Sequence, residues 1–226
     1  MIENKKGILY LVSTHIGNPE DITLRALKVL KECDIILCEE FKPAGKFLRP
    51  LGIKKPLISI NEHNEEEGTS DAIKELLSGK KLALISDAGS PLFSDPGNLL
   101  LQRCKKEGVK VSPLPGASSL IPALQMSGCA HDDFYFAGWL SPKTEEREQQ
   151  LRTLKKRNEA MVIMETPYRL KQLLTSIDTV MHQRKVFLAL DISGENEEFL
   201  EGTAQELLRL VEGAKKRNFV LILEKG

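Results

Sequence analysis

The sequence predicts an α/β protein of two halves, each built on a β-sheet that is covered by helices. Short apolar segments alternate with longer amphipathic ones along the whole chain. In the first half, each apolar segment is followed by a helical one, which predicts a mostly parallel sheet with helices on both faces. In the second half, long and short connections mix, which predicts a mixed sheet. The 226 residues allow one large domain or two small ones.

The elements of the first half follow from apolar periodicity and from helix-ending glycines. Residues 8–12 form an apolar run typical of a buried strand, and residues 21–31 place Ile22, Ala26 and Leu30 on one helical face. Gly79 and Gly108 mark the ends of two later helices. The same criteria predict strand 34–38, helix 42–51, strand 57–60, helix 70–78, strand 82–86, helix 95–107 and strand 109–113.

The second half begins after Leu114-Pro115-Gly116, which is typical of a hinge. The domains are therefore predicted at 1–116 and 117–226, and two α/β halves joined at a hinge predict a ligand cleft between them. Helix 117–127 is predicted despite Pro122. The remaining predicted elements are strands 134–138, 160–165, 186–190 and 219–223, a short strand at 199–200, and helices 145–156, 169–177 and 204–211.

Composition is that of an ordinary globular protein, with 41% hydrophobic and 28% charged residues. No apolar run is long enough for a membrane span, and the charged N-terminus has no apolar signal core, so we expect a cytoplasmic protein. Cys33, Cys38 and Cys104 lie in apolar segments and are expected to be buried free thiols. The four histidines are scattered, so we expect no metal site.

A formal net charge of zero argues against strong electrostatic binding of long nucleic acids. A local basic stretch at 41–55 nevertheless contains no acidic residue. This stretch is either a solvated helix face or a site for nucleic acid or another anionic substrate. Its cationic residues are Lys42, Lys46, Arg49, Lys54 and Lys55.

The most informative segment is 84–97, where an apolar strand opens into a loop of Gly, Ser, Pro and Asp. Asp95-Pro96 predicts a helix start, with the carboxylate as N-cap and proline at the first helical position. Open α/β sheets bind ligands at such loops, where glycine lets a ligand approach the backbone and the helix N-terminus offers free N–H groups. The alternative is an ordinary tight turn.

Four further segments carry polar groups at predicted strand ends. The loop 13–21 follows the first strand, at the same predicted sheet edge as 84–97. Segment 115–119 is either a linker with an N-cap serine or a set of donors facing the cleft. Segment 165–169 holds a carboxylate that is either functional or one half of a Glu–Arg pair. Glu39-Glu40 is either an acid/base pair or two solvated side chains.

Three common nucleophile and nucleotide motifs are absent from the sequence: G-x-S-x-G, G-x-x-x-x-G-K-[ST] and G-x-G-x-x-G. Their absence argues against the usual hydrolases, P-loop enzymes and dinucleotide-dependent dehydrogenases.

Taken in order, segments 9–18, 20–27, 86–97, 113–118 and 165–169 resemble the tetrapyrrole methylase superfamily. Within it they resemble the branch that methylates the 2′-hydroxyl of a cytidine in small-subunit ribosomal RNA. The resemblance covers nearly the whole chain. It implies a two-domain fold, a homodimer, and S-adenosylmethionine bound in the cleft between the domains.

The resemblance also implies a set of cofactor-binding residues. Backbone groups and hydroxyls would hold the polar parts of the cofactor, and Phe93, Ile163 and Met164 would form apolar walls. Where a base accepts the proton of the ribose hydroxyl, the candidates are Glu39, Glu40 and Asp95, and the sequence does not choose among them. The implied cofactor residues are Ile16, Ser90, Phe93, Ser94, Ser118, Ser119, Ile163 and Met164.

The chain departs from the family pattern at several places. His15 stands where the family usually has proline, Glu40 to Ala44 replaces an Asp-Thr-Arg segment, and 191–194 replaces Glu-Leu-Thr-Lys. The sequence also ends at Gly226, without the family's small C-terminal extension, so a shortened or divergent member is expected. Two alternatives therefore stay open: methylation of a tetrapyrrole or other small molecule, and a non-catalytic paralogue that only binds the cofactor.

Overall fold

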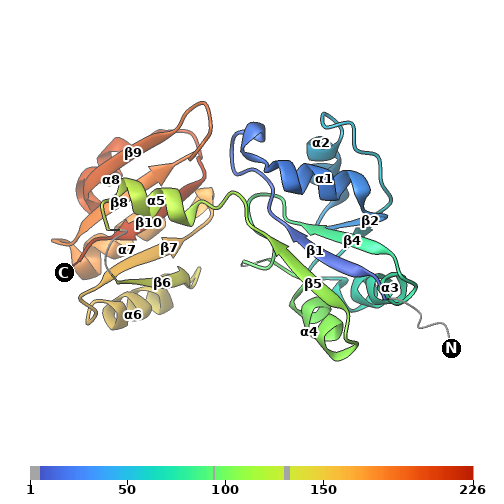
Figure 1. Cartoon of the computed structure of the whole chain (residues 1–226). Coiled ribbons are helices and arrows are strands. Elements are labelled where there is room, and N and C mark those ends of the chain that lie inside the picture. The colour runs from blue at the N-terminus through green and yellow to red at the C-terminus, as the bar shows by residue number, and fades with distance from the viewer. Residues whose placement is uncertain (1–5, 94, 130–132, 226) are drawn as a thin grey trace. The chain divides into compact units, whose positions relative to one another are not determined.

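The structure is a computed structural model that describes residues 6–93, 95–129 and 133–225. The chain divides into two compact units, residues 1–118 and 119–226, and each is described here by itself (Figure 1). Among the described residues, no helix is long and apolar enough to cross a membrane.

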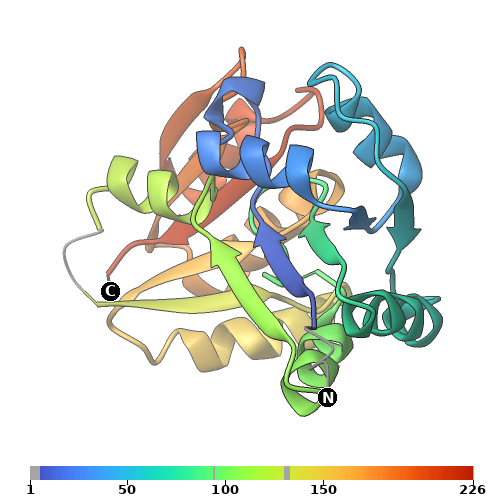
Figure 2. The same ribbon diagram turned by 45° about the vertical axis from the view of Figure 1, so that its right-hand side comes forward.

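Unit 1 alternates strands and helices, as the sequence predicts. Its sheet has the order β3-β2-β4-β1-β5, and all neighbouring strands are parallel. The arrowheads of β5, β1 and β4 accordingly point the same way (Figure 2). The elements are β1 (Ile8–Val12), α1 (Leu24–Glu32), β2 (Ile35–Cys38), α2 (Phe41–Leu48), β3 (Leu57–Ser59), α3 (Glu65–Leu77), β4 (Lys81–Ile85), α4 (Asn98–Lys106) and β5 (Lys110–Leu114).

Helices cover both faces of this sheet, which confirms the doubly covered arrangement. Ala26 of α1 and Ala44 of α2 pack with Val12 and Ile85 on one face, whereas Leu100 of α4 packs with Leu84 on the other. The helix that follows β1 therefore lies on one face of the sheet and the helix that follows β4 lies on the other, although the two strands are neighbours. Open α/β sheets bind ligands at such a reversal.

Unit 2 contains the mixed sheet β6-β7-β10-β8-β9, in which only β6 and β7 pair in parallel. Helices α6, α7 and α8 enclose a core on one face, and α5 contacts β10. The elements are α5 (Leu120–Met126), β6 (Phe134–Trp139), α6 (Thr144–Leu154), β7 (Ala160–Met164), α7 (Leu170–Met181), β8 (Lys185–Leu190), β9 (Glu198–Thr203), α8 (Ala204–Leu210) and β10 (Phe219–Leu223).

Several predicted helix starts were wrong. The helix predicted to begin at residue 21 begins at Leu24, because the Thr23 hydroxyl caps it by accepting the Ala26 N–H at 3.1 Å. Helix α3 begins five residues before the predicted start. Its acidic first turn is stabilised by the helix dipole, and Gly68 is needed because a Cβ there would lie 2.3 Å from the Ser59 carbonyl oxygen. Helix α5 begins at Leu120 instead of residue 117.

The predicted thiols behave as expected: Cys33, Cys38 and Cys104 are free and buried. Burial raises the pKa of each of these thiols to about 11. They are therefore protonated at neutral pH and are not nucleophiles.

Candidate functional site

The loops after β1 and β4 are joined by backbone hydrogen bonds. The Thr14 N–H donates to the Gly89 carbonyl at 2.8 Å, and the Gly89 N–H donates to the His15 carbonyl at 3.2 Å. Gly89 has φ +78°, a left-handed conformation that glycine adopts without strain. The two predicted ligand-facing turns thus lie side by side at the carboxyl edge of the sheet.

Hydroxyl groups extend this connection to the end of β5. The Ser13 and Ser90 hydroxyls lie 3.0 Å apart, and the Ser86 hydroxyl donates to the Gly89 carbonyl at 2.8 Å. Ser90 also donates to the Ala117 carbonyl at 3.4 Å. Three segments that are far apart in sequence therefore hold one another in place.

A cavity of about 360 Å³ opens where these three segments meet. Its size lies at the lower end of the range for small-molecule sites. Serine hydroxyls face apolar and proline side chains, a surface suited to a ligand of mixed polarity. The lining residues are Leu11, Ser13, Ser90, Pro91, Pro113, Leu114, Pro115 and Gly116.

Gly116 keeps this junction closely packed. A Cβ at Gly116 would lie 2.6 Å from Cβ of Ser13, which forces one segment to move. We expect Gly116→Ala to lower the free energy of unfolding by about 1–3 kcal/mol, measured by urea denaturation. The matched control is Gly45→Ala in α2, where nothing lies within 4 Å of the new methyl group. Alanine there should be neutral or stabilising by up to about 1 kcal/mol, so equal losses in both variants would refute the packing argument.

The predicted helix start at Asp95-Pro96 was wrong, and two of the N–H groups at the actual start have a partner. Helix α4 begins at Asn98 after Gly97, whose φ is +114°. The N–H groups of Gly97 and Leu99 donate to the Glu65 carboxylate at 2.9 and 3.1 Å. A carboxylate from α3 therefore occupies the N-terminus of α4, and Asp95 is left outside the helix.

Asp95 instead belongs electrostatically to a group of carboxylates at the ends of β2 and β4. Burial, with the charges of Glu39 and Asp87, raises the pKa of Asp95 to about 6. Burial and the charge of Asp87 raise the pKa of Glu39, and burial and the charge of Glu40 raise the pKa of Asp87. Of the candidate bases, Asp95 and Glu39 are therefore coupled to each other and to Asp87, while the charge of Glu40 acts on Glu39 and Asp87.

These carboxylates are not arranged as a metal site. Within the described residues, no three His, Cys, Asp or Glu side chains gather in a way that could hold a metal ion.

His15, one of the departures from the family pattern, lies in the loop after β1. Its ring centroid is 5.5 Å from that of Phe47 in α2, and its Nδ1 is buried without a hydrogen-bond partner in the structure. The predicted basic stretch 41–55 includes α2 and the segment after it, and Lys42, Lys46 and Arg49 are exposed.

The cofactor residues implied by the resemblance fall on both units. Ile16 packs near Gly89, Ser90 borders the cavity, and Phe93 keeps 41% of its surface exposed. Ser118 ends unit 1 and Ser119 begins unit 2. Ser94 lies outside the described residues.

Two of the cofactor residues implied by the resemblance lie on β7 and differ in burial. Ile163 is completely buried in the unit 2 core, and its strand pairs with β6 on one side and β10 on the other. Met164 is only partly buried at the end of the strand.

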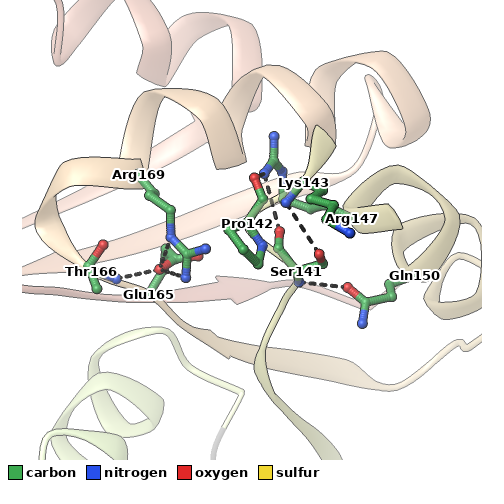
Figure 3. A network of polar contacts seen from close by, with 8 residues as sticks. All are labelled: Ser141, Pro142, Lys143, Arg147, Gln150, Glu165, Thr166 and Arg169. Carbon is green, nitrogen blue, oxygen red and sulfur yellow. Dashed lines mark hydrogen bonds and ion pairs between the residues drawn. The ribbon is translucent and has the colours of Figure 1, made fainter. Parts of the chain in front are cut away.

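Glu165 and Arg169 form a buried ion pair directly after β7 (Figure 3). The Glu165 carboxylate accepts the Thr166 N–H at 2.6 Å and Arg169 Nε at 2.7 Å, and its side chain is 1% exposed. Of the two interpretations of this segment, the structure supports the ion pair. The pair fixes the turn that carries Tyr168.

Sequence reasoning missed Arg147, which is 2% exposed. Its guanidinium donates to the Ser176 hydroxyl at 3.0 Å. It also donates to the carbonyls of Ser141 and Pro142 at 3.2 and 3.0 Å (Figure 3). The signal was its helical spacing with Leu151 and Leu154, which places an arginine on the buried face of α6. These contacts connect α6 to α7 and to the loop that precedes α6.

Comparison with known proteins agrees with this geometry. The family profile of tetrapyrrole (corrin/porphyrin) methylases matches residues 8–208. The chain is 39% identical to ribosomal RNA small subunit methyltransferase I of Thermotoga maritima over 97% of this chain and 99% of that protein. It is 38% identical to the protein of the same name from Bacillus subtilis, over 96% of this chain and 75% of that protein.

Solved structures share the fold. A cobalt precorrin-4 methyltransferase superposes with a TM-score of 0.71 at 16% identity, covering 96% of this chain and 94% of that one. A diphthine synthase superposes with a TM-score of 0.76 at 15% identity, covering 97% and 90%. The two-unit α/β architecture, the profile match and the near full-length relatives together show that this chain belongs to the tetrapyrrole methylase family.

Proposed function

We propose that this chain is an S-adenosylmethionine-dependent methyltransferase that methylates the 2′-hydroxyl of a cytidine in small-subunit ribosomal RNA. The observation that carries the proposal is the joined set of loops at the carboxyl edge of the unit 1 sheet. It occurs in a chain 39% identical, over nearly its full length, to a methyltransferase named for that RNA. Ribosomal subunits are cytoplasmic in bacteria, so we propose the same location for this protein.

The cavity chemistry fits the proposed cofactor. S-adenosylmethionine combines an adenosine, an amino acid and a positively charged sulfur, so it needs hydroxyls, backbone groups and apolar walls. Ser13 and Ser90 supply hydroxyls, while Leu11 and Pro113 supply apolar surface. We propose that Ile16, Ser90, Phe93, Ser94 and Ser118 hold it from unit 1, with Ser119, Ile163 and Met164 from unit 2.

When bound, the cofactor supplies a methyl group on a sulfonium sulfur, which is already a good leaving group. The residues of this chain then have two tasks: to hold the ribose hydroxyl in line with the methyl group, and to accept its proton. We propose Asp95 as the acceptor, because burial and the nearby negative charges of Glu39 and Asp87 raise its pKa to about 6, close to neutral pH. Burial is the largest cause of this raised pKa, and the negative charge of Glu39 adds to it.

We also propose a homodimer. The support is β6, an edge strand of the unit 2 sheet that exposes three aromatic side chains, Phe134, Tyr135 and Trp139. Large apolar side chains on an open strand edge are typical of a surface that a second chain covers. Light scattering should give a mass twice the 25.3 kDa of one chain.

The proposed function is tested in two steps. Calorimetric titration with S-adenosylmethionine and S-adenosylhomocysteine should show one site per chain. Small ribosomal subunits lacking the modification should then accept labelled methyl groups, and nuclease digestion followed by mass spectrometry should identify 2′-O-methylcytidine. Cofactor binding without transfer to ribosomal subunits, but with transfer to a porphyrin, would replace the proposed substrate with a small molecule.

A further inference from the structure

Unit 2 contains a second cavity, of about 590 Å³, at the edge where β8 ends and β9 begins. Its apolar lining includes Leu170, Leu190, Leu200 and Val211. None of the residues proposed to hold the cofactor lines it.

The rim of this cavity presents an aromatic ring. Tyr168 lies on the turn between β7 and α7 and is 70% exposed. The buried Glu165–Arg169 pair anchors that turn on both sides of the tyrosine. Lys216 Nζ lies 4.1 Å from the centroid of the ring, which places a cation on one of its faces.

The charge on the rim is positive. Lys171, Lys215 and Lys216 line the cavity and are exposed, and the structure records no carboxylate partner for them among the residues it describes. Arg217 differs, because its guanidinium contacts Asp191 at 2.9 Å and also Glu198. Lys171 and Lys215 are therefore available to an anionic ligand beside Lys216, which lies over the Tyr168 ring, whereas the arginine holds the cavity wall together.

We propose that this cavity binds a single-stranded segment of the RNA substrate, with a base against Tyr168 and backbone phosphates against Lys171, Lys215 and Lys216. Sites for single-stranded RNA combine an aromatic stacking platform with a cationic track along the backbone, and both occur here. The proposal rests on the proposed function, since it assigns to the RNA substrate a contact outside the cofactor site.

The test measures binding of a short, cytidine-rich, fluorescein-labelled RNA to the full chain at several salt concentrations. Tyr168→Ala should weaken binding about 5- to 100-fold, and Tyr168→Phe should stay within about twofold because its ring still stacks. The double variant Lys215→Gln/Lys216→Gln should lower the slope of log affinity against log salt by about 1.4. The exposed pair Lys105→Gln/Lys106→Gln on α4 is the matched control and should leave the slope unchanged.

Calorimetry with S-adenosylmethionine and methylation of small ribosomal subunits accompany these measurements. If the wild-type chain methylates the subunits but the variants bind RNA as it does, the cavity proposal alone is overturned. If the wild-type chain binds the cofactor but neither binds RNA nor methylates the subunits, the proposed substrate is overturned together with the cavity. Uroporphyrin binding that Tyr168→Ala abolishes would also overturn it, because the cavity would then take a tetrapyrrole.

Discussion

Replacing Glu165 by alanine is expected to lower the free energy of unfolding by about 3–5 kcal/mol. The carboxylate is 1% exposed and is the only recorded partner of the Arg169 guanidinium in the described part of the chain. Its removal leaves a largely buried cation, 22% exposed, and an unpaired N–H on Thr166. Urea denaturation followed by circular dichroism measures the loss.

Two controls separate this effect from a general sensitivity to lost charge. Glu32→Ala removes an exposed partner of Lys28 at 4.0 Å and should cost less than about 0.5 kcal/mol. Glu165→Gln retains an acceptor for the Thr166 N–H and should lose less than the alanine variant. A loss below about 1 kcal/mol for Glu165→Ala would mean that the ion pair does not stabilise the turn.

Replacing Asp95 by asparagine is expected to slow methyl transfer to small ribosomal subunits by about 10²- to 10⁴-fold, because the amide cannot accept the proton of the hydroxyl. The wild-type rate should fall as the pH drops through about 6, the pKa of Asp95. Initial rates from pH 5 to 8 measure both effects. A rate within twofold of the wild type would exclude Asp95 as the base.

Glu39→Gln provides a matched variant for the pH profile. It removes a negative charge that raises the pKa of Asp95, so the acid limb of the profile should move to lower pH. An unchanged limb would mean that a different group controls the rate.

The Asp95 carboxylate should lower the stability of the fold. Its pKa rises from 3.8, the ordinary value for an aspartic acid, to about 6, so the folded chain holds its proton where the unfolded chain releases it. Stability is therefore lost as the pH rises from about 4 to 6. Because the group is partly solvated, Asp95→Asn should be more stable than the wild type by only about 1 kcal/mol at pH 7, and equally stable near pH 4.

Much of the fold follows from the sequence because the sheets leave strong local signals. The strands 8–12 and 219–223 have the predicted bounds, since apolar residues fill both faces of a buried strand. The first residues of the helices were harder to predict from the sequence. The cap of α4 comes from Glu65, 32 residues before Gly97 in the sequence, and a cap that is supplied from another helix leaves no local pattern.

The site was predictable to a similar extent. The loops after β1 and β4 were expected at one sheet edge, and the structure joins them through Thr14 and Gly89. The coupling of Asp95 to Asp87 and Glu39 was not predicted, because it depends on the order of β2 and β4 in the sheet. The sequence analysis also did not predict that Lys215 and Lys216 lie near Tyr168. They come close only because β10, which follows them, pairs with β7, which precedes Tyr168.

The carboxylate that caps α4 has a consequence for which nucleotides this protein admits. Many α/β proteins bind phosphate with the free N–H groups of a helix at this position, but here Glu65 already accepts the N–H groups of Gly97 and Leu99. Glu39, Asp87 and Asp95 add further negative charge along the same edge. Adenosine triphosphate, which shares its adenosine with the proposed methyl donor, would be repelled from this edge, whereas an adenosine that carries a cationic sulfur would be attracted. The Glu65 carboxylate thus stands where such proteins hold a phosphate group.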